Sequence, residues 1–125
     1  MASVLTNVGE DWVCQRMVGS GALSGFDMHF LGWGTGAGTA AKGDTTLFTE
    51  ASEARATATI SVTGSGATAK YQAVGTLTAD GSKTITNAGL FSASSAGSMA
   101  VKWDHSGVPL LVGEGIQYTV TLDPA

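Results

Sequence analysis

Hydrophobic and polar residues alternate along most of the chain, and this alternation predicts β-strands. Five runs place apolar side chains at every second position: residues 26–31, 55–63, 69–78, 99–103 and 116–122. Strands with one face in a core and the other face in water show this pattern. The runs are short and closely spaced, which favours two packed antiparallel sheets over a parallel sheet with crossover helices. We therefore expect an all-β, jelly-roll-like sandwich of about seven to eight strands over residues 26–125.

The alternation also predicts which side chains face the core and where the chain turns. The expected inward residues of the second and third runs are Ala56, Ala58, Ile60, Val62, Tyr71, Ala73 and Leu77. Gly64-Ser65-Gly66 predicts a hairpin loop between those two runs. Asp80-Gly81 is the clearest turn signal, because both residues tolerate positive φ, so we expect the strands on either side to pair as a hairpin. Asp104-His105-Ser106-Gly107 is expected to be a solvated turn.

Residues 1–25 are expected to form an N-terminal arm that contains one short helix. Asn7 and Glu10 have the spacing of a capping box and glycines follow residue 18, so the helix should span residues 8–18. Its apolar residues at helical spacing are Val8, Trp12, Val13 and Met17. We expect this stripe to pack on the core, while an arm that clasps a neighbouring subunit stays open as an alternative.

The segment LGWGTGAGTAAKGDTTLF, residues 31–48, alternates glycine with other residues around one tryptophan. It does not match a nucleotide-binding motif, because Lys42 stands before Gly43 rather than after a glycine, and no βαβ unit follows. We expect an irregular loop of about 20 residues that starts at Gly32. Asp44 should anchor its far end, and its middle should be free.

The glycines of this segment would let another backbone approach closely, while the indole of Trp33 offers a large, rigid contact area. We therefore expect Trp33 to contact another subunit or a shell rather than to join the core of its own domain. The candidate interaction surface consists of Gly32, Trp33, Gly34, Gly36 and Trp12.

Charge is sparse, which limits the partners that the chain can bind. Only 13% of the residues are charged, the net charge is −4, and the six Lys and Arg residues are scattered. A phosphate backbone needs several converging cations, so we expect no nucleic-acid partner. No stretch approaches the roughly 18 apolar residues of a membrane span, and no export signal is recognisable, so we expect no membrane and synthesis in the cytosol. The single cysteine, Cys14, cannot form an internal disulfide and is expected to be buried.

Residues that could carry catalysis or bind a metal are few. Asp27 and His29 would lie on one face of a strand, but two ligands without a third are weak evidence for zinc. His105 and the aspartate before it would point to opposite faces of a strand, which does not fit a hydrolase triad. Glu50 and Glu53 are expected to be solvated. We therefore expect no enzyme, no cofactor and no small-molecule substrate.

Three blocks of the sequence carry a resemblance to a known class of proteins. They are LGWGTGAGTAAKGDTTLFTEASEAR, YQAVGTLTADGSKTITNAGLFSASSAGSMAVKW and GEGIQYTVTL. They contain a G-W/T-G element, an A-A-x-x-D-T-x-L-x-x-E turn, an I-T-x-x-G-L-F strand and a closing G-x-x-I-x-Y/F-T-V strand. In this order, over about residues 31–122, they resemble small virion structural proteins of tailed bacteriophages.

The resemblance implies a sandwich protein that is made in the host cytoplasm and carried on the virion. One expectation is a capsid decoration, or cement, protein that binds the outside of the shell and stabilises it. Its partners would be the major capsid protein and copies of itself, as a dimer or trimer. The alternative is a tail-fibre or tail-associated module for adhesion or receptor binding. The sequence shows no shaft, heptad or collagen-like repeat, which favours decoration.

Overall fold

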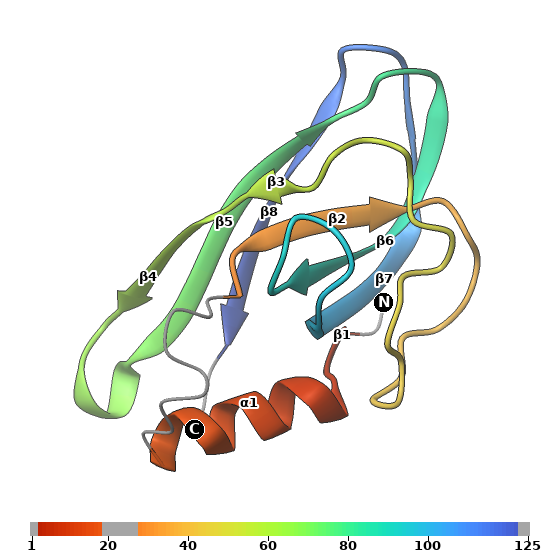
Figure 1. The fold of residues 1–125 in the computed structure, drawn as a ribbon. Coiled ribbons are helices and arrows are strands. Elements are labelled where there is room, and N and C mark those ends of the chain that lie inside the picture. The colour runs from red at the N-terminus through yellow and green to blue at the C-terminus, as the bar shows by residue number, and fades with distance from the viewer. Residues whose placement is uncertain (1–2, 19–27, 123–125) are drawn as a thin grey trace.

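Two antiparallel β-sheets pack face to face and form a sandwich (Figure 1). In this computed structural model, residues 3–18 and 28–122 are described, with the backbone alone for residues 12 and 15–18. The larger sheet has five strands in the order β1-β7-β6-β2-β3, and the smaller sheet has three in the order β4-β5-β8. The predicted all-β sandwich is confirmed, and the eight described strands agree with the expected number.

The larger sheet consists of β1 (Ser3–Leu5), β2 (Phe30–Gly34), β3 (Ala56–Thr57), β6 (Lys83–Phe91) and β7 (Met99–Leu110). The smaller sheet consists of β4 (Thr59–Thr63), β5 (Lys70–Thr78) and β8 (Gly115–Leu122). The helix α1 (Asn7–Val18) follows β1, and a short 3₁₀ turn, Gly66–Thr68, lies between β4 and β5.

The core lies between the sheets and comes from alternate residues of the central strands. Five of its large side chains are at most 2% exposed: Leu31, Trp33, Leu77, Ile85 and Leu90. They belong to β2, β5 and β6, so both sheets contribute to one continuous core. Burial of this apolar surface is the main favourable contribution to folding.

The strands whose patterns alternate most regularly are confirmed. β5 buries Ala73 and Leu77, and β8 buries Tyr118 and Val120. β4 and β5 are antiparallel neighbours joined through residues 64–69, as the hairpin signal at residues 64–66 predicted. Gly64 and Gly66 in that connection have φ values of 72° and 57°. A turn with positive φ at two positions favours glycine at both.

The predicted hairpin at Asp80-Gly81 is wrong. The strands on either side, β5 and β6, lie in different sheets, so this turn carries the chain across the sandwich. Ala79 is held by the loop between β7 and β8. Its N–H donates to the carbonyl of Glu114 at 2.7 Å, and its carbonyl accepts from the N–H of Gly113 at 2.9 Å. These tertiary hydrogen bonds override the local preference for a hairpin turn.

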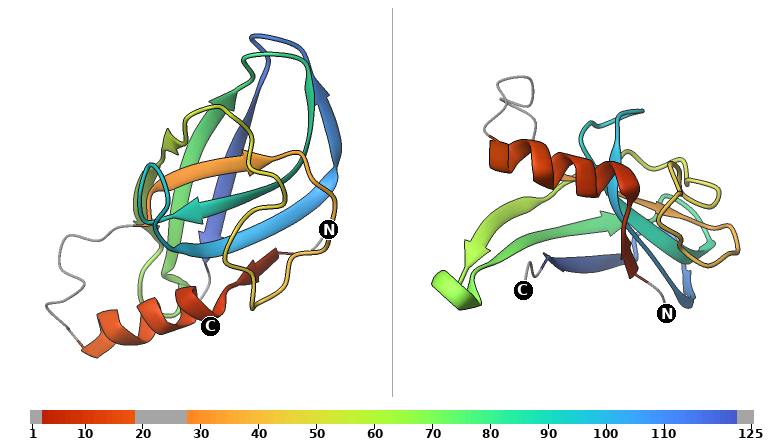
Figure 2. Two further views of the ribbon diagram at one scale, coloured as in Figure 1. Left: turned by 45° about the vertical axis from the view of Figure 1, so that its right-hand side comes forward. Right: turned by 90° about the horizontal axis from the view of Figure 1, so that it is seen from below.

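The predicted strand over residues 55–63 is two strands in different sheets. The chain divides at Ala58, so that β3 pairs with β2 and β4 pairs with β5. Ala58 is buried as predicted, but Ile60 is 37% and Val62 is 73% exposed, contrary to the prediction. The β4–β5 hairpin extends beyond the larger sheet, so no described strand covers these side chains (Figure 2, right).

The strand predicted at residues 26–31 corresponds to β2, which lies later in the chain. β2 begins at Phe30, while residues 26 and 27 lie outside the described part of the chain. The Gly-Trp segment therefore begins inside the larger sheet, between β6 and β3. Trp33 is 1% exposed, so the prediction that it lies outside the core of its domain is wrong. It alternates with Gly32 and Gly34 and therefore shares the inward face of β2 with Leu31.

β7 is longer than predicted. It continues through residues 104–107, where a solvated turn was expected, and ends at Leu110. It pairs with β6 over most of its length, with register shifts between Ile85 and Asn87 and between Leu90 and Phe91. These irregularities let one long strand follow the twist of the sheet.

α1 confirms the predicted helix, but Thr6 rather than Asn7 caps it. The Thr6 hydroxyl accepts the Gly9 N–H at 3.0 Å and donates to the carbonyl of Met99 at 2.6 Å, so the cap also ties the helix to β7. Cys14 is exposed on α1, so its predicted burial is wrong. Within residues 3–18 and 28–122, no helix has the length and apolar character needed to cross a bilayer.

Trp33→Ala should lower the free energy of unfolding by about 3–5 kcal/mol, because it removes a buried indole and leaves a cavity. Trp33→Phe should cost less, since it keeps much of the apolar volume and loses the N–H bond to Glu53. Denaturant unfolding of the wild type and both variants measures these differences. Equal stability of the wild type and Trp33→Ala would show that the indole lies outside the core.

Candidate binding interface

The alternating glycines form a flat strip on the outer face of β2 and beyond its end. A Cβ atom at Gly34 would lie 2.5 Å from the carbonyl oxygen of Phe48, and one at Gly36 would lie 2.8 Å from the same oxygen. The N–H groups of Thr35 and Gly36 donate to the carbonyls of Thr49 and Phe48 at 3.0 and 2.8 Å. The glycines are required because a second backbone lies directly against the strand.

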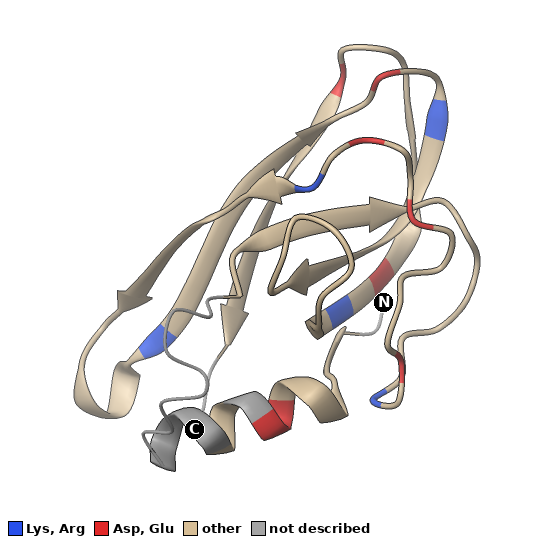
Figure 3. Cartoon of the chain, in the orientation of Figure 1, with Lys and Arg blue, Asp and Glu red and all other residues tan. Residues whose placement is uncertain are grey.

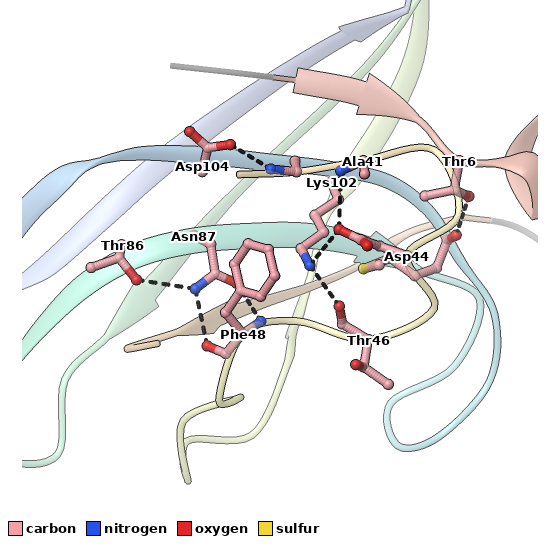
Figure 4. Close-up of polar contacts among 11 residues, drawn as sticks. Thr6, Ala41, Asp44, Thr46, Phe48, Thr86, Asn87, Lys102 and Asp104 are labelled. Carbon is pink, nitrogen blue, oxygen red and sulfur yellow. Dashed lines mark hydrogen bonds and ion pairs between the residues drawn. The ribbon is translucent and has the colours of Figure 1, made fainter. Parts of the chain in front are cut away.

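The outer loop, residues 35–49, is also held in its middle, where the sequence analysis expected it to be free (Figure 4). The N–H of Ala40 donates to the carboxylate of Asp104 on β7 at 2.7 Å. The Asn87 side chain on β6 accepts the N–H of Phe48 at 3.0 Å and donates to its carbonyl at 3.1 Å. The loop therefore forms a fixed layer on the outer face of the larger sheet.

Lys102 is the centre of this layer. Its side chain is 1% exposed, and its ammonium donates to the carboxylate of Asp44 at 2.9 Å and to the carbonyl of Thr46 at 2.8 Å. It also lies 3.3 Å from the ring centroid of Phe48. The hydrogen bond from Lys102, with a second from the N–H of Ala41, lowers the pKa of Asp44. A buried cation that loses its partner is strongly destabilising, so Lys102 fixes the course of the loop.

Glu53 forms a second buried polar centre. Its carboxylate accepts the indole N–H of Trp33 and the N–H of Asp80, both at 3.0 Å, and pairs with Lys83. Burial acts to raise the pKa of Glu53, but the hydrogen bonds from Lys83, Asp80 and Trp33 outweigh it and lower the pKa to about 2. The Glu53 side chain is only 7% exposed, so its predicted solvation is wrong. The Glu50 side chain is partly exposed and pairs with Arg55 at 2.8 Å.

The predicted interaction surface is not brought together. Gly32, Trp33 and Gly34 are buried in the larger sheet, and Gly36 is half-buried within the outer loop, against Phe48. The side chain of Trp12 lies outside the described part of the chain. The Gly-Trp element therefore packs within the domain, because Gly34 and Gly36 lie against the chain's own residues Phe48 and Thr49.

An open cleft of about 910 Å³ lies at the free edges of the two sheets, between β8 and the strands β1 and β7. We call it the edge cleft. Its apolar walls include Val101, Trp103, Val108, Ile116 and Leu122. β8 pairs with β5 on one side, and no described strand pairs with its other side. The lining residues include no Asp, Glu, Lys or Arg, and Figure 3 shows β8 without charge.

A polar pair interrupts the apolar wall of the edge cleft. A ring nitrogen of His105 is hydrogen-bonded to the hydroxyl of Tyr118 at 2.9 Å, and the ring of Trp103 packs edge-on against Tyr118 with centroids 5.4 Å apart. Burial raises the pKa of the Tyr118 phenol, so the hydroxyl stays protonated at neutral pH. His105, predicted to be a solvated turn residue, is therefore a half-buried strand residue.

The edge cleft combines a neutral apolar wall with an unpaired strand edge. An extended peptide can add to such an edge through main-chain hydrogen bonds, while alternate side chains enter the groove. The absence of charge along the walls suits an uncharged peptide, since a charged side chain would lose hydration without gaining a partner.

The residues considered for zinc binding give no site in the described part of the chain. Asp27 lies outside it, and the ring of His29 lies 4.3 Å from that of Phe30. Among residues 3–18 and 28–122, no group of three or more His, Cys, Asp and Glu residues is arranged to hold a metal.

Sequence analysis missed Lys102 and the edge cleft. A lysine between Val101 and Trp103 reads as the solvent face of a strand, and the pattern of β7 alone does not show that the outer loop covers this face. The cleft depends on how β8 lies relative to β1 and β7, and no pattern within one strand contains that information.

Comparison with protein-family models, with curated proteins and with solved structures finds no match to this chain. The resemblance to phage virion proteins therefore stays a prediction.

Lys102→Met should lower the free energy of unfolding by roughly 1–3 kcal/mol, because methionine keeps the volume but removes the hydrogen bonds to Asp44 and Thr46. Hydrogen exchange should become faster at the backbone of the outer loop. Lys42→Met is the matched control, since Lys42 forms only an exposed ion pair with Glu10 and should change stability little. Equal effects of the two variants would contradict the anchoring role of Lys102.

Acid should destabilise the wild type more steeply than Glu53→Gln. The pKa of Glu53 is about 2 in the folded protein against a reference value of 4.5, so the charged carboxylate stabilises the fold above about pH 4.5. This contribution is lost as the pH falls toward 2. Glutamine can still accept the Trp33 N–H but carries no charge. Melting temperatures measured across this range test the prediction, and parallel curves for the two proteins would refute it.

Proposed function

We propose that this chain is a structural protein of a tailed-phage virion that binds the outside of the capsid and stabilises it. It acts by association rather than by catalysis, and its partners are the major capsid protein and further copies of itself. The three sequence blocks that resemble virion proteins support this proposal. The first block forms β2 and the outer loop, the second runs from β5 to the start of β7, and the third forms β8.

The edge cleft is the observation that carries the proposal. A decoration protein must hold a large assembly without a chemical step, and strand addition does this with main-chain hydrogen bonds and apolar contacts. The free edge of β8 is eight residues long and uncharged, and the facing wall contributes Val101, Trp103 and Val108. We assign to this cleft an extended, uncharged segment of the major capsid protein.

The rigidity of the domain supports the same role. The outer loop is tied down by Lys102, Asp104 and Asn87, and the turn between the sheets is tied down by Glu53. A preorganised partner loses little conformational entropy on binding, so more of the contact energy stabilises the complex.

A tail-fibre or tail-associated receptor-binding module is the second candidate. The hydrogen-bonded pair of His105 and Tyr118 beside Trp103 favours it, because aromatic rings combined with polar groups also suit a glycan. The two candidates place the protein at different sites on the particle and in different numbers.

Purified virions of the phage that encodes the chain provide the first test. A stained gel calibrated against the major capsid protein should show hundreds of copies per particle if the protein decorates the shell. A handful of copies would place it in the tail, and its absence from virions would refute both candidates.

Val108→Glu should weaken binding to capsids that lack the protein by at least about tenfold, because it introduces a charge into the edge cleft. Val112→Glu is the matched control, since Val112 is 70% exposed and does not line the cleft. Co-sedimentation of each labelled protein with such capsids measures the binding. Equal binding by the two variants would show that the cleft is not the contact surface.

A further inference from the structure

β4 is an edge strand that lacks the usual protection against pairing. It stands first in the strand order of the smaller sheet, so no described strand faces its outer edge. Edge strands of natural proteins are commonly blocked by a charged residue, a proline or a bulge. The sequence of β4, Thr-Ile-Ser-Val-Thr, contains no charge and no proline, and its register with β5 is continuous over all five residues.

The side chains of β4 are exposed on both faces of the strand. Four of its five residues are exposed, and the fifth, Thr63, is partly exposed. Val62 is 73% exposed, which is unusual for a β-branched side chain on the face that elsewhere packs into the core. Both the backbone edge and the apolar side chains of β4 are therefore accessible to another molecule.

The sequence of β4 is self-complementary when the strand pairs with a second copy of itself in the antiparallel direction. A two-fold axis at Ser61 sets Ile60 opposite Val62 of the second copy, and Thr59 opposite Thr63. The apolar pairs then share one face and the hydroxyl groups share the other, which are favourable cross-strand combinations. A shift by one residue would set apolar residues opposite hydroxyl residues and lose this match.

The charges nearest to this edge do not oppose such pairing. Lys70 lies opposite Thr63 in the β4–β5 register, at one end of β4. A two-fold axis at Ser61 would place the Lys70 residues of the two copies at opposite ends of the paired strands. Their separation of about 20 Å exceeds the screening length of roughly 8–10 Å at ordinary salt concentrations.

We propose that two copies of this chain pair through β4, antiparallel about a two-fold axis at Ser61. The three strands of each smaller sheet would then join into one continuous sheet of six strands. The proposed function includes association between copies of this chain, and this inference rests on it and identifies β4 as the contact surface. Five residue pairs make a small interface, so the dimer should dissociate on dilution.

Pairing through the other free edge fits the geometry less well. β4 and β8 are each antiparallel to β5 and so run in the same direction. With the core faces of both copies on the same side of the joined sheet, a contact between β4 of one copy and the β8 edge of the next would be parallel. Such a contact is head-to-tail and does not close about a two-fold axis. The β8 edge also borders the edge cleft, which the proposed function assigns to a segment of the major capsid protein.

Sedimentation velocity of the full chain over a wide range of concentration tests the proposal. The wild type should shift from monomer to dimer as its concentration rises. Val62→Lys should stay monomeric over the same range, because lysine on an edge strand opposes pairing. Val112→Lys, at a comparably exposed valine outside β4, should dimerise like the wild type. A wild type that stays monomeric, or a dimer that Val62→Lys does not weaken, would overturn the proposal.

Cysteine cross-linking tests the register. In a Cys14→Ser background, Ser61→Cys should form a disulfide-linked dimer under mild oxidation, since directly opposed residues lie within disulfide range. Thr63→Cys alone should not cross-link, whereas a mixture of Thr59→Cys and Thr63→Cys should. Cross-linking of Thr63→Cys to itself would refute the register.

These outcomes are separate from those that test capsid binding. If the protein dimerises through β4 but is absent from virions, the proposed dimer is supported and the proposed location is refuted. If the wild type decorates capsids but is monomeric in solution, the proposed location is supported and the proposed dimer is refuted.

Discussion

Lys102 is a buried cation on the outer face of the larger sheet, and the outer loop takes its course because this charge must be paired. Asp44 and the carbonyl of Thr46 supply the partners, and both belong to the loop. Once the loop lies there, β2 must be smooth beneath it, and the glycine strip follows from that requirement. The larger sheet is thus covered by the smaller sheet on one face and by the outer loop on the other, where Leu47 packs against Phe91.

This arrangement gives the two sheets different surfaces. In the larger sheet, Lys102 and Lys83 form ion pairs within the domain. The first holds the outer loop, and the second holds Glu53 beside the turn between the sheets. The smaller sheet has no charge in β4 or β8, the two strands that form its edges. Edges of this kind are places where another strand can add, and the proposed contacts with a shell and with a second copy use one edge each.

The sequence predicted a strand well where one of its faces is buried and the other exposed. β5 and β8 are such strands, and their alternation located them and their inward residues. β2 and the first half of β7 are covered on both faces, so Trp33 alternates with glycine and Lys102 stands on a face that a single-strand pattern assigns to solvent. Asp80-Gly81 has a strong local signal, but its conformation depends on the loop that binds Ala79. The candidate cleft could not be predicted, because it arises from the relative position of two sheet edges.

The anchors of the outer loop are distant in sequence, and this constrains how the chain can fold. Phe48 is bonded to a side chain 39 residues later, Asp44 to one 58 residues later, and Ala40 to one 64 residues later. A chain emerging from the ribosome therefore exposes the glycine-rich segment well before β6 and β7 exist to receive it. Contacts of such long range slow folding. The outer loop must therefore dock late, after the β6–β7 hairpin has formed. Until then the glycine strip of β2 is open to pairing with other chains.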